Sequence, residues 1–258
     1  MVNGLPLQGR SIVVTRPVHQ AAQISQQLQD VGAEVINFPL LDIVEPSDTD
    51  GCRRKLAVLD RYDFLIFTSP NAVECALSYL TDGLPETVKV AAVGKKTAQC
   101  LSHHGISVSI VPSDTFNSES LLACADLQAV KGLSIAIIRG EGGRSLLRET
   151  LSERGACVDY IDVYRRICPA DNLLPLVKLQ QQSGLDIIIL TSVESLHHLF
   201  RLGKGQLWLN DTTLLVGSER IASMVKQTSH AGRVLVAPDP SDGSIFSRIQ
   251  DWVNDKNR

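Results

Sequence analysis

Residues 64–80 read FLIFTSPNAVECALSYL, with an apolar run, a polar turn and an amphipathic segment in direct succession. The run at 64–67 carries no charge, which is typical of a strand covered on both faces of a parallel sheet. Ser69 is a suitable helix N-cap, and Pro70 is favoured at the first helical position. An apolar stripe follows, made of Val73, Ala76, Leu77 and Leu80. The stretch therefore predicts the strand–turn–helix unit of an α/β protein.

The same unit returns at an offset of 123 residues, so the chain is internally duplicated. Residues 187–200 read IIILTSVESLHHLF, and Thr191-Ser192 takes the place of Thr68-Ser69. The residues that recur at this offset include Gly9, Ser11, Ile12, Arg16, Gly32-Ala33, Pro46, Lys55-Leu56, Asp63 and Val93-Gly94. Each half alternates short apolar strands with helices, which predicts doubly wound parallel sheets.

Segments 39–46 and 162–169 are equivalent in the repeat, are extended in pattern and each end at a proline. We interpret them as two crossovers between lobes, whose adjacent strands form a hinge. Residues 1–38 and 168–258 then form the first lobe, and residues 47–161 form the second. Each lobe contains half of each repeat. Two sequential lobes that divide near residue 125 are the alternative arrangement.

Composition and charge exclude several classes of protein. Apolar residues make up 44% of the chain and charged residues 21%, which excludes general disorder. The formal net charge of -3 supplies no basic field, so we expect no nucleic-acid partner. Residues 1–9 lack the pattern of a secretory signal, and no apolar run is long enough to span a bilayer. We therefore expect a cytoplasmic protein that is not bound to membranes, with its six scattered cysteines reduced.

Polar residues gather where the predicted strands end. In an open α/β sheet, ligands bind beyond the carboxyl ends of the strands, where helix N-termini present free N–H groups. Six loops of this kind supply amides, hydroxyls and guanidinium groups, which together suit a polyanion. They are residues 15–17, 68–71, 94–97, 139–144, 191–192 and 217–220. We expect these loops to face a cleft between the lobes and to form the working site.

Each of these features also has a purely structural interpretation. Ser69 and Ser192 are also compatible with helix caps that have no further role. Gly140–Gly143 is also compatible with a tight turn. Arg16 and Arg139 suit surface charges, although they fall at the same strand end in both copies of the repeat. These alternatives stay open on the sequence alone.

Other kinds of site find little support. The P-loop pattern is absent, and no complete G-x-G-x-x-G follows a strand, which argues against nucleotide binding. The histidine pairs at 103–104 and 197–198 are sequence neighbours whose side chains diverge on a helix, so we predict no metal site. No Ser-His-Asp or Cys-His arrangement has a recognisable local context, and we do not predict hydrolysis.

Taken together and in order, the loop motifs resemble those of the uroporphyrinogen-III synthase family. The motifs are VTRP at 14–17, FTSPNAVE at 67–74, AVGKKTA at 92–98, RGEGGR at 139–144, VYRR at 163–166 and LTS at 190–192. Each is weak alone, but the ordered set is specific and covers nearly the whole chain. The resemblance implies two flavodoxin-like α/β domains joined by a two-strand ladder, which agrees with the crossovers inferred above. The chain departs from the family at residues 217–220, where many members carry a threonine pair.

The resemblance also implies a reaction. The substrate would be hydroxymethylbilane, a linear tetrapyrrole with eight carboxylates. A lyase of this family closes it to uroporphyrinogen III with inversion of the last pyrrole ring, in tetrapyrrole and haem biosynthesis, and uses no cofactor. The expected catalytic residue is Tyr164, carried over from the family's tyrosine in this motif. The expected substrate-binding residues are Arg16, Thr68, Ser69, Asn71, Thr97, Arg139, Gly140, Gly142, Arg144, Thr191, Ser192 and Ser218.

Alternatives to this interpretation remain at this stage. Tyr164 also suits a packing role across the ladder. The rival function is a two-lobed sensor that closes on a small anion without catalysis, because repeat, cleft and hinge would look the same. We expect a monomer, and the sequence leaves open a transient contact with porphobilinogen deaminase, which supplies the substrate.

Overall fold

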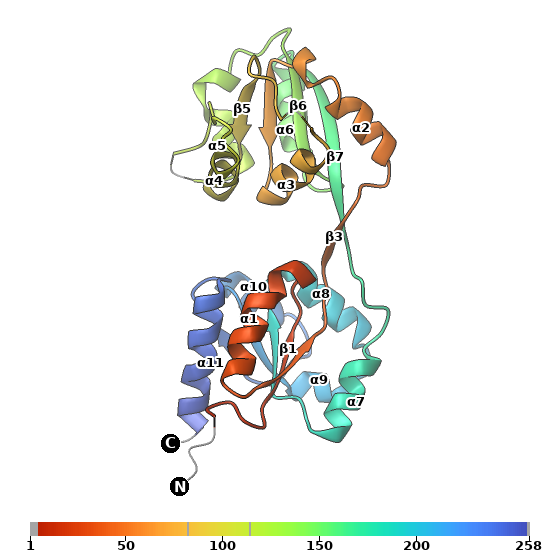
Figure 1. Cartoon of the computed structure of the whole chain (residues 1–258), viewed down its shortest axis with the longest axis vertical. Coiled ribbons are helices and arrows are strands. Elements are labelled where there is room, and N and C mark those ends of the chain that lie inside the picture. Colours follow the sequence, from red (N-terminus) through yellow and green to blue (C-terminus); the bar gives the residue numbers. More distant parts are fainter. Residues whose placement is uncertain (1–4, 82, 114, 257–258) are drawn as a thin grey trace. The chain divides into compact units, whose positions relative to one another are not determined.

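A computed structural model describes residues 5–81, 83–113 and 115–256 (Figure 1). Contacts within the chain divide it into two compact units. Unit 1 comprises Met1–Asp42 and Ile167–Arg258, and unit 2 comprises Ile43–Arg166. Both boundaries fall inside the two segments that the sequence marks as crossovers. None of the helices in the described part of the chain is both long enough and apolar enough to cross a bilayer.

Unit 1 is a five-stranded sheet in the order β10-β9-β8-β1-β2, and every neighbouring pair is parallel. Its strands are β1 (Ser11–Val14), β2 (Glu34–Asn37), β8 (Ile187–Leu190), β9 (Thr213–Val216) and β10 (Val234–Val236). Its helices are α1 (Val18–Asp30), α7 (Leu174–Gln182), α8 (Val193–Leu202), α9 (Leu207–Asp211), α10 (Glu219–Val225) and α11 (Asp242–Lys256).

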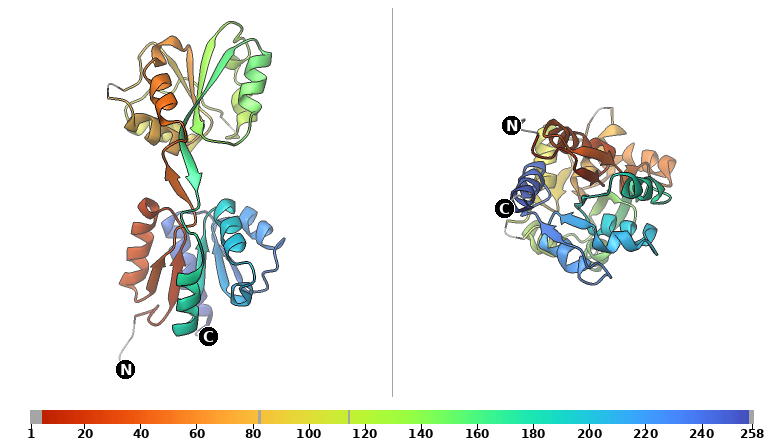
Figure 2. Two further views of the ribbon diagram at one scale, coloured as in Figure 1. Left: turned by 90° about the vertical axis from the view of Figure 1, so that its right-hand side faces the viewer. Right: turned by 90° about the horizontal axis from the view of Figure 1, so that it is seen from below.

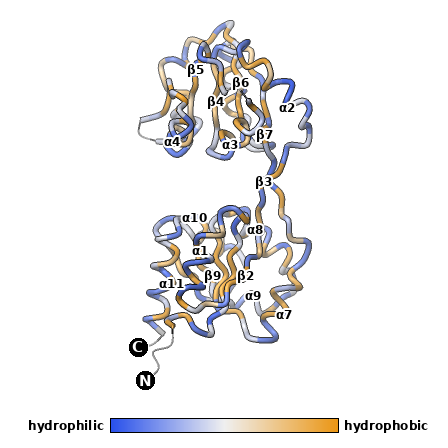
Figure 3. The backbone as a smooth tube through the Cα atoms, viewed as in Figure 1, coloured by the Kyte–Doolittle hydropathy of each residue, from blue (hydrophilic) through white to orange (hydrophobic). Residues whose placement is uncertain are grey.

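The central strands β1 and β8 of unit 1 carry no charge and are buried on both faces. Ile12 and Val14 pack with α1 and α11, whereas Val13 between them packs with α7, α8 and α10. Helices on both faces can be followed in Figure 2, and Figure 3 shows the apolar residues concentrated in the central strands. Alternate residues of one strand thus supply two separate cores, which defines a doubly wound sheet.

Unit 2 repeats this architecture. Its sheet has the order β3-β7-β6-β4-β5, in which β7, β6, β4 and β5 run parallel. The strands are β3 (Asp42–Val44), β4 (Phe64–Phe67), β5 (Lys89–Ala92), β6 (Ser134–Gly140) and β7 (Cys157–Ile167). The helices are α2 (Thr49–Leu56), α3 (Pro70–Ser78), α4 (Lys95–His103), α5 (Ser118–Ala123) and α6 (Leu146–Glu153), with short 3₁₀ turns η1 (Leu59–Arg61) and η2 (Ala125–Leu127).

The internal repeat explains why the two sheets match. At the offset of the repeat, β1 and β2 correspond to β6 and β7, while β4 and β5 correspond to β8 and β9. The order β2-β1-β8-β9 in unit 1 therefore equals β7-β6-β4-β5 in unit 2. A parallel bridge from Ala91 to Ile110 stands where β10 stands in unit 1. Each sheet is thus assembled from half of each repeat.

The crossovers pair with one another. Strand β3 is the repeat equivalent of residues 165–167, at the end of β7, and β3 and β7 are hydrogen-bonded neighbours. Arg165 Nε also donates to the Glu45 carbonyl over 3.2 Å. The two-strand ladder that the resemblance implies is therefore present.

Candidate functional site

A pocket of about 230 Å³ lies at the carboxyl ends of β4 and β6 in unit 2. This is the sheet edge at which an open α/β fold binds its ligands. The parallel registers of β4, β6 and β7 bring their following loops to the same edge. The pocket collects most of the unit 2 residues that the sequence singled out: Thr68, Ser69, Arg139, Gly140, Gly142, Arg144 and Tyr164.

Tyr164 owes its position to a β-bulge. Strand β7 pairs Asp162 with Arg139 and then Tyr164 with Gly140, so that Val163 is passed over. Regular alternation would turn Tyr164 to the face of Asp162. With the bulge, Val163 and Tyr164 both pack in the core that Ile161 enters, and Tyr164 is only 2% exposed. A bulge that re-aims one side chain is common beside functional sites.

The residue opposite Tyr164 has to be glycine. A Cβ atom built on Gly140 would lie 2.5 Å from Cε2 and Cζ of the tyrosine ring and 3.0 Å from its hydroxyl. Contacts this short require either the ring or the strand to move. Gly140 therefore gives the phenol room to lie flat against the end of β6.

Two side chains fix the Tyr164 hydroxyl. Its oxygen lies 3.2 Å from Ser69 Oγ, and Arg166 donates to it from Nη2 over 3.2 Å. Ser69 is also the N-cap of α3, because its Oγ accepts the amide of Ala72 over 3.1 Å. The donation from Arg166 leaves the phenolic proton to be given to Ser69 or to a ligand.

Arg139 is buried, and its guanidinium interacts with other groups of unit 2. Its Nε donates to the Gly140 carbonyl over 3.0 Å and lies 3.3 Å from Asp162 Oδ1, and its guanidinium is 4.3 Å from the centroid of the Tyr160 ring. Burial raises the pKa of the Asp162 carboxyl, while the Arg139 charge acts in the opposite direction. Arg139 also donates to the Arg144 carbonyl over 3.3 Å. It therefore shapes the glycine-rich loop as well as lining the pocket.

Arg144 is an exposed cation of the pocket. Its side chain is 65% exposed and forms a hydrogen-bonded ion pair with Glu119. The hydrogen bond from Arg144 lowers the pKa of Glu119, which stays ionised at neutral pH. Exposed ion pairs of this kind are weak, so a ligand carboxylate can replace Glu119. Gly142 and Gly143, at φ 75° and 85°, form the left-handed turn that carries Arg144 past the end of β6.

Two predicted residues of unit 2 lie outside this pocket. Asn71 stands in the first turn of α3, and Thr97 is buried in the first turn of α4. Conversely, the pocket includes Tyr160, Arg166 and Glu141, which the sequence analysis did not choose as site residues. Arg166 belongs to the quoted VYRR motif, which was a usable signal, whereas Tyr160 sits inside an ordinary strand pattern.

The remaining predicted residues belong to unit 1. Arg16 is 7% exposed, forms an ion pair with Asp242 and donates to the Pro240 carbonyl over 2.5 Å. Its guanidinium thus joins the end of β1 to the start of α11, and the surface-charge interpretation of Arg16 is wrong. A ligand carboxylate could reach this group only in competition with Asp242.

The serines of unit 1 act as helix caps. Ser192 Oγ accepts the amide of Ser195 over 3.0 Å at the start of α8, and Ser218 Oγ accepts the amide of Ile221 over 3.4 Å at the start of α10. Thr191 lies against the next loop, since a Cβ on Gly217 would be 3.5 Å from Thr191 Cα. Ser192 and Ser218 therefore cap α8 and α10.

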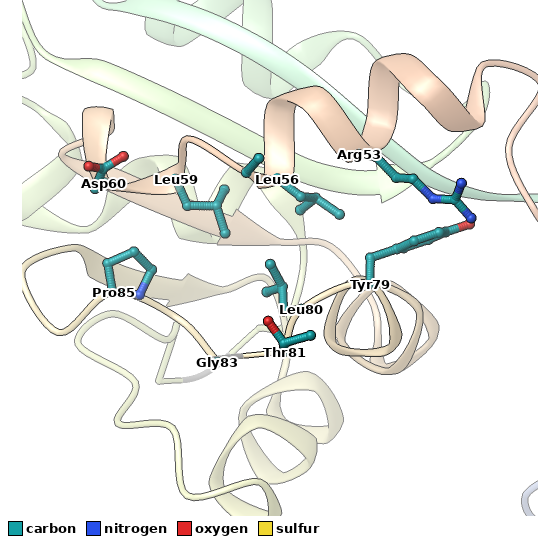
Figure 4. A pocket seen from close by; sticks show the side chains of 10 residues that line it. Arg53, Leu56, Leu59, Asp60, Tyr79, Leu80, Thr81, Gly83 and Pro85 are labelled. Atoms are coloured by element: carbon teal, nitrogen blue, oxygen red, sulfur yellow. The ribbon is translucent and has the colours of Figure 1, made fainter.

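A larger hollow of about 510 Å³ lies at the other edge of the unit 2 sheet (Figure 4). Leu59 and Asp60 precede β4 and Pro85 precedes β5, so the hollow is at the amino ends of these strands. The Arg53 guanidinium lies over the Tyr79 ring at 5.7 Å on its rim. None of the predicted site residues lines it. We therefore assign the site to the smaller pocket, because volume alone does not outweigh the position of loops and helix N-termini.

Comparison with known proteins identifies the family. The family model described as Uroporphyrinogen-III synthase HemD matches residues 22–247. Uroporphyrinogen-III synthase of Salmonella typhimurium is 32% identical over 248 residues, covering 93% of this chain and all of that protein. The synthase of Synechococcus elongatus is 32% identical over 265 residues, covering 96% and 97%.

Solved structures agree at the level of the fold. A uroporphyrinogen III synthase structure from Thermus thermophilus superposes with a TM-score of 0.66 at 18% identity, covering 96% of this chain and 99% of that one. The uroporphyrinogen-III synthetase of Helicobacter pylori gives a TM-score of 0.58 at 18% identity, covering 94% and 99%. By its motifs, its fold and its relatives, the chain belongs to the uroporphyrinogen-III synthase family.

Proposed function

We propose that this chain is a uroporphyrinogen-III synthase, a lyase of tetrapyrrole and haem biosynthesis. It closes hydroxymethylbilane to uroporphyrinogen III and inverts the last pyrrole ring. The observation that carries the site assignment is the Tyr164 hydroxyl, which a bulge places between Ser69 and Arg166 in a pocket that Arg139 and Arg144 also line.

The reaction requires the protein mainly to position its substrate. Loss of the terminal hydroxyl leaves a cation stabilised by its pyrrole ring. The far ring attacks this cation at its substituted carbon, and the resulting spiro intermediate fragments and recombines in the inverted orientation. Hydroxymethylbilane in solution cyclises by itself without inversion. The enzyme must therefore hold its substrate in one curled conformation. Positioning of this kind can supply about 7–11 kcal/mol of barrier reduction at most.

We assign Tyr164 to the departure of the hydroxyl. The phenol would donate its proton to the leaving oxygen, and Arg166 would stabilise the negative charge that develops on the phenol oxygen, at the 3.2 Å seen here. A single general acid typically contributes about 10²–10⁴-fold in rate. Ser69, at 3.2 Å, holds the hydroxyl in place before the substrate binds.

We assign substrate carboxylates to the cations and hydroxyls of the loops. Arg144 is the first candidate, because its partner Glu119 is exposed and exchangeable. Arg139 adds positive potential from its buried position. The loops with Asn71, Thr97, Thr191, Ser192 and Ser218 stay candidates because each follows the carboxyl end of a strand. Arg16 would take part only if its pair with Asp242 opened.

We also propose a monomer in the cytoplasm that receives its substrate from porphobilinogen deaminase. All residues that line the pocket come from unit 2 of one chain, which supports the monomer. All six cysteines are free thiols, which suits a reducing compartment.

Genetic complementation tests the proposed function. A bacterial strain that lacks its own synthase and requires added haem would receive this gene or an empty vector. The proposal predicts growth without haem and loss of the uroporphyrin I that accumulates with the vector. Folded protein in the cells with neither effect would contradict it.

A further inference from the structure

A carboxylate, a thiol and an imidazole meet on the surface of unit 2, between α3 and α4. Cys100 Sγ donates to Glu74 Oε1 over 3.1 Å, and His104 Nε2 lies 3.0 Å from the same oxygen. The three potential ligand atoms lie within 4.8 Å of one another. Within the described part of the chain, this is the only such convergence of three metal-binding side chains.

The two helices place this cluster. Cys100 and His104 are four residues apart at the end of α4, so their side chains share one face of the helix. Glu74 projects from α3, which packs beside α4. The sequence pattern at 103–104 does not indicate this cluster, because adjacent histidine side chains diverge on a helix. The convergence depends on a residue 26 positions before Cys100 and on another helix.

The ligand set and its spacing fit zinc. Zinc binds Cys sulfur, His nitrogen and carboxylate oxygen at about 2.0–2.3 Å in tetrahedral geometry, which puts the ligand atoms about 3.4–3.6 Å apart. The two contacts with Glu74, at 3.0 and 3.1 Å, need to lengthen by about 0.5 Å to reach that spacing. The separation between Cys100 Sγ and His104 Nε2 is no more than 4.8 Å and needs to close to about 3.5 Å. The side chains of Glu74 and His104 are 58% and 40% exposed, which leaves them room to adjust and leaves water access to a fourth position.

We propose that Glu74, Cys100 and His104 form a binding site for a thiophilic divalent cation, with Zn²⁺ as the best fit. On binding, the metal replaces the thiol proton, which passes to solvent, and the thiolate becomes a ligand. The ion would tie α3 to α4. Because Ser69 caps α3 and its Oγ lies 3.2 Å from the Tyr164 hydroxyl, the site is linked through one helix to the proposed active pocket. The metal site does not depend on the proposed reaction.

Cobalt titration of the full-length protein, first freed of metal with a chelator, tests this site. We expect one equivalent of Co²⁺ to produce a thiolate-to-metal charge-transfer band together with the visible bands of a tetrahedral ion. One equivalent of Zn²⁺ should remove both. The melting temperature should rise with free Zn²⁺, because an ion that binds the folded state stabilises it.

Variants then assign the ligands. Cys100→Ser should abolish the charge-transfer band, and Glu74→Gln and His104→Gln should each weaken Zn²⁺ binding by at least about tenfold. The matched controls are His103→Gln, the neighbouring histidine, and Cys157→Ser, an exposed cysteine elsewhere in unit 2. Both controls should bind as the unaltered protein does, and circular dichroism establishes that every variant is folded. Absence of the band in the unaltered protein, or its persistence in Cys100→Ser, would overturn the proposal.

Discussion

The β-bulge beside Tyr164, and not its position in the strand sequence alone, determines where its side chain points. Counted along an ideal strand, it would share a face with Tyr160 and Asp162. The bulge opposite Arg139 and Gly140 turns it toward α3 instead. The VYRR motif pointed to this tyrosine through family resemblance. The partners of its hydroxyl depend on the bulge, which no alternation of apolar residues reveals.

The first prediction concerns the tyrosine itself. Tyr164→Phe keeps the ring that packs on Gly140 but removes the proton donor. We expect kcat to fall by about 10²–10⁴-fold while KM changes little, because the donor acts on the leaving hydroxyl. Steady-state kinetics with enzymatically generated hydroxymethylbilane measure both constants. Unchanged kcat would leave Tyr164 with only a packing role across the ladder.

The second prediction tests how Tyr164 is positioned. In Gly140→Ala the new methyl group would meet the tyrosine ring at 2.5 Å. We expect at least about a tenfold loss of kcat, and a loss of about 1–3 kcal/mol in the free energy of unfolding from overpacking. The matched control is Gly243→Ala in α11, where a Cβ meets nothing within 4 Å. Denaturant titration and kinetics check both variants, and a fully active Gly140→Ala enzyme would refute the argument.

At the scale of elements, Arg16 connects a strand to a helix. Its sequence position predicted a guanidinium at a strand end, and the structure places it there. The ion pair with Asp242 could not be predicted, since Asp242 follows 226 residues later in a polar segment. Contacts between segments far apart in the sequence are difficult to predict in the rest of the chain as well. The left-handed glycines Gly32 and Gly155 after α1 and α6 follow from local sequence, whereas contacts between distant segments do not.

The third prediction compares two arginines that pair with α11. Arg16→Gln removes one partner of a largely buried ion pair, whose side chains are 7% and 19% exposed. Breaking such a pair costs about 3–5 kcal/mol, so the melting temperature should fall clearly. Arg233→Gln breaks the exposed pair with Asp255, at 47% and 55%, and should change stability by less than about 1 kcal/mol. Equal melting temperatures for the two variants, measured by calorimetry, would show that Arg16 does not hold α11.

At the scale of the whole molecule, the internal repeat predicted most of the architecture. The two sheets have the same strand order because each combines half of each repeat, as the crossover interpretation requires. Short elements such as α5, α9 and the 3₁₀ turns were not predicted, because they lack enough residues to show a period. The sequence predicted a site in the loops at the carboxyl ends of the strands, facing a cleft between the lobes, but not the contacts within it.

The fourth prediction concerns how binding of the substrate carboxylates is distributed among the loops. A ligand with eight carboxylates meets several cations, so the loss of one should weaken binding without changing the path of the reaction. We expect Arg144→Gln to raise KM a few-fold, to leave kcat nearly unchanged and to yield isomer III as before. Because Arg144 is exposed, its removal should not alter the melting temperature. A shift of the product toward isomer I would instead give Arg144 a role in directing ring inversion.

The product isomer tests the central claim, that this chain closes hydroxymethylbilane with ring inversion. Porphobilinogen and its deaminase would be incubated with and without the purified chain, and the uroporphyrin isomers separated by chromatography after oxidation. We expect isomer III only when the chain is present and isomer I in its absence. Isomer I in both reactions, with the deaminase active, would contradict the synthase function and leave a two-unit protein whose ligand is another anion.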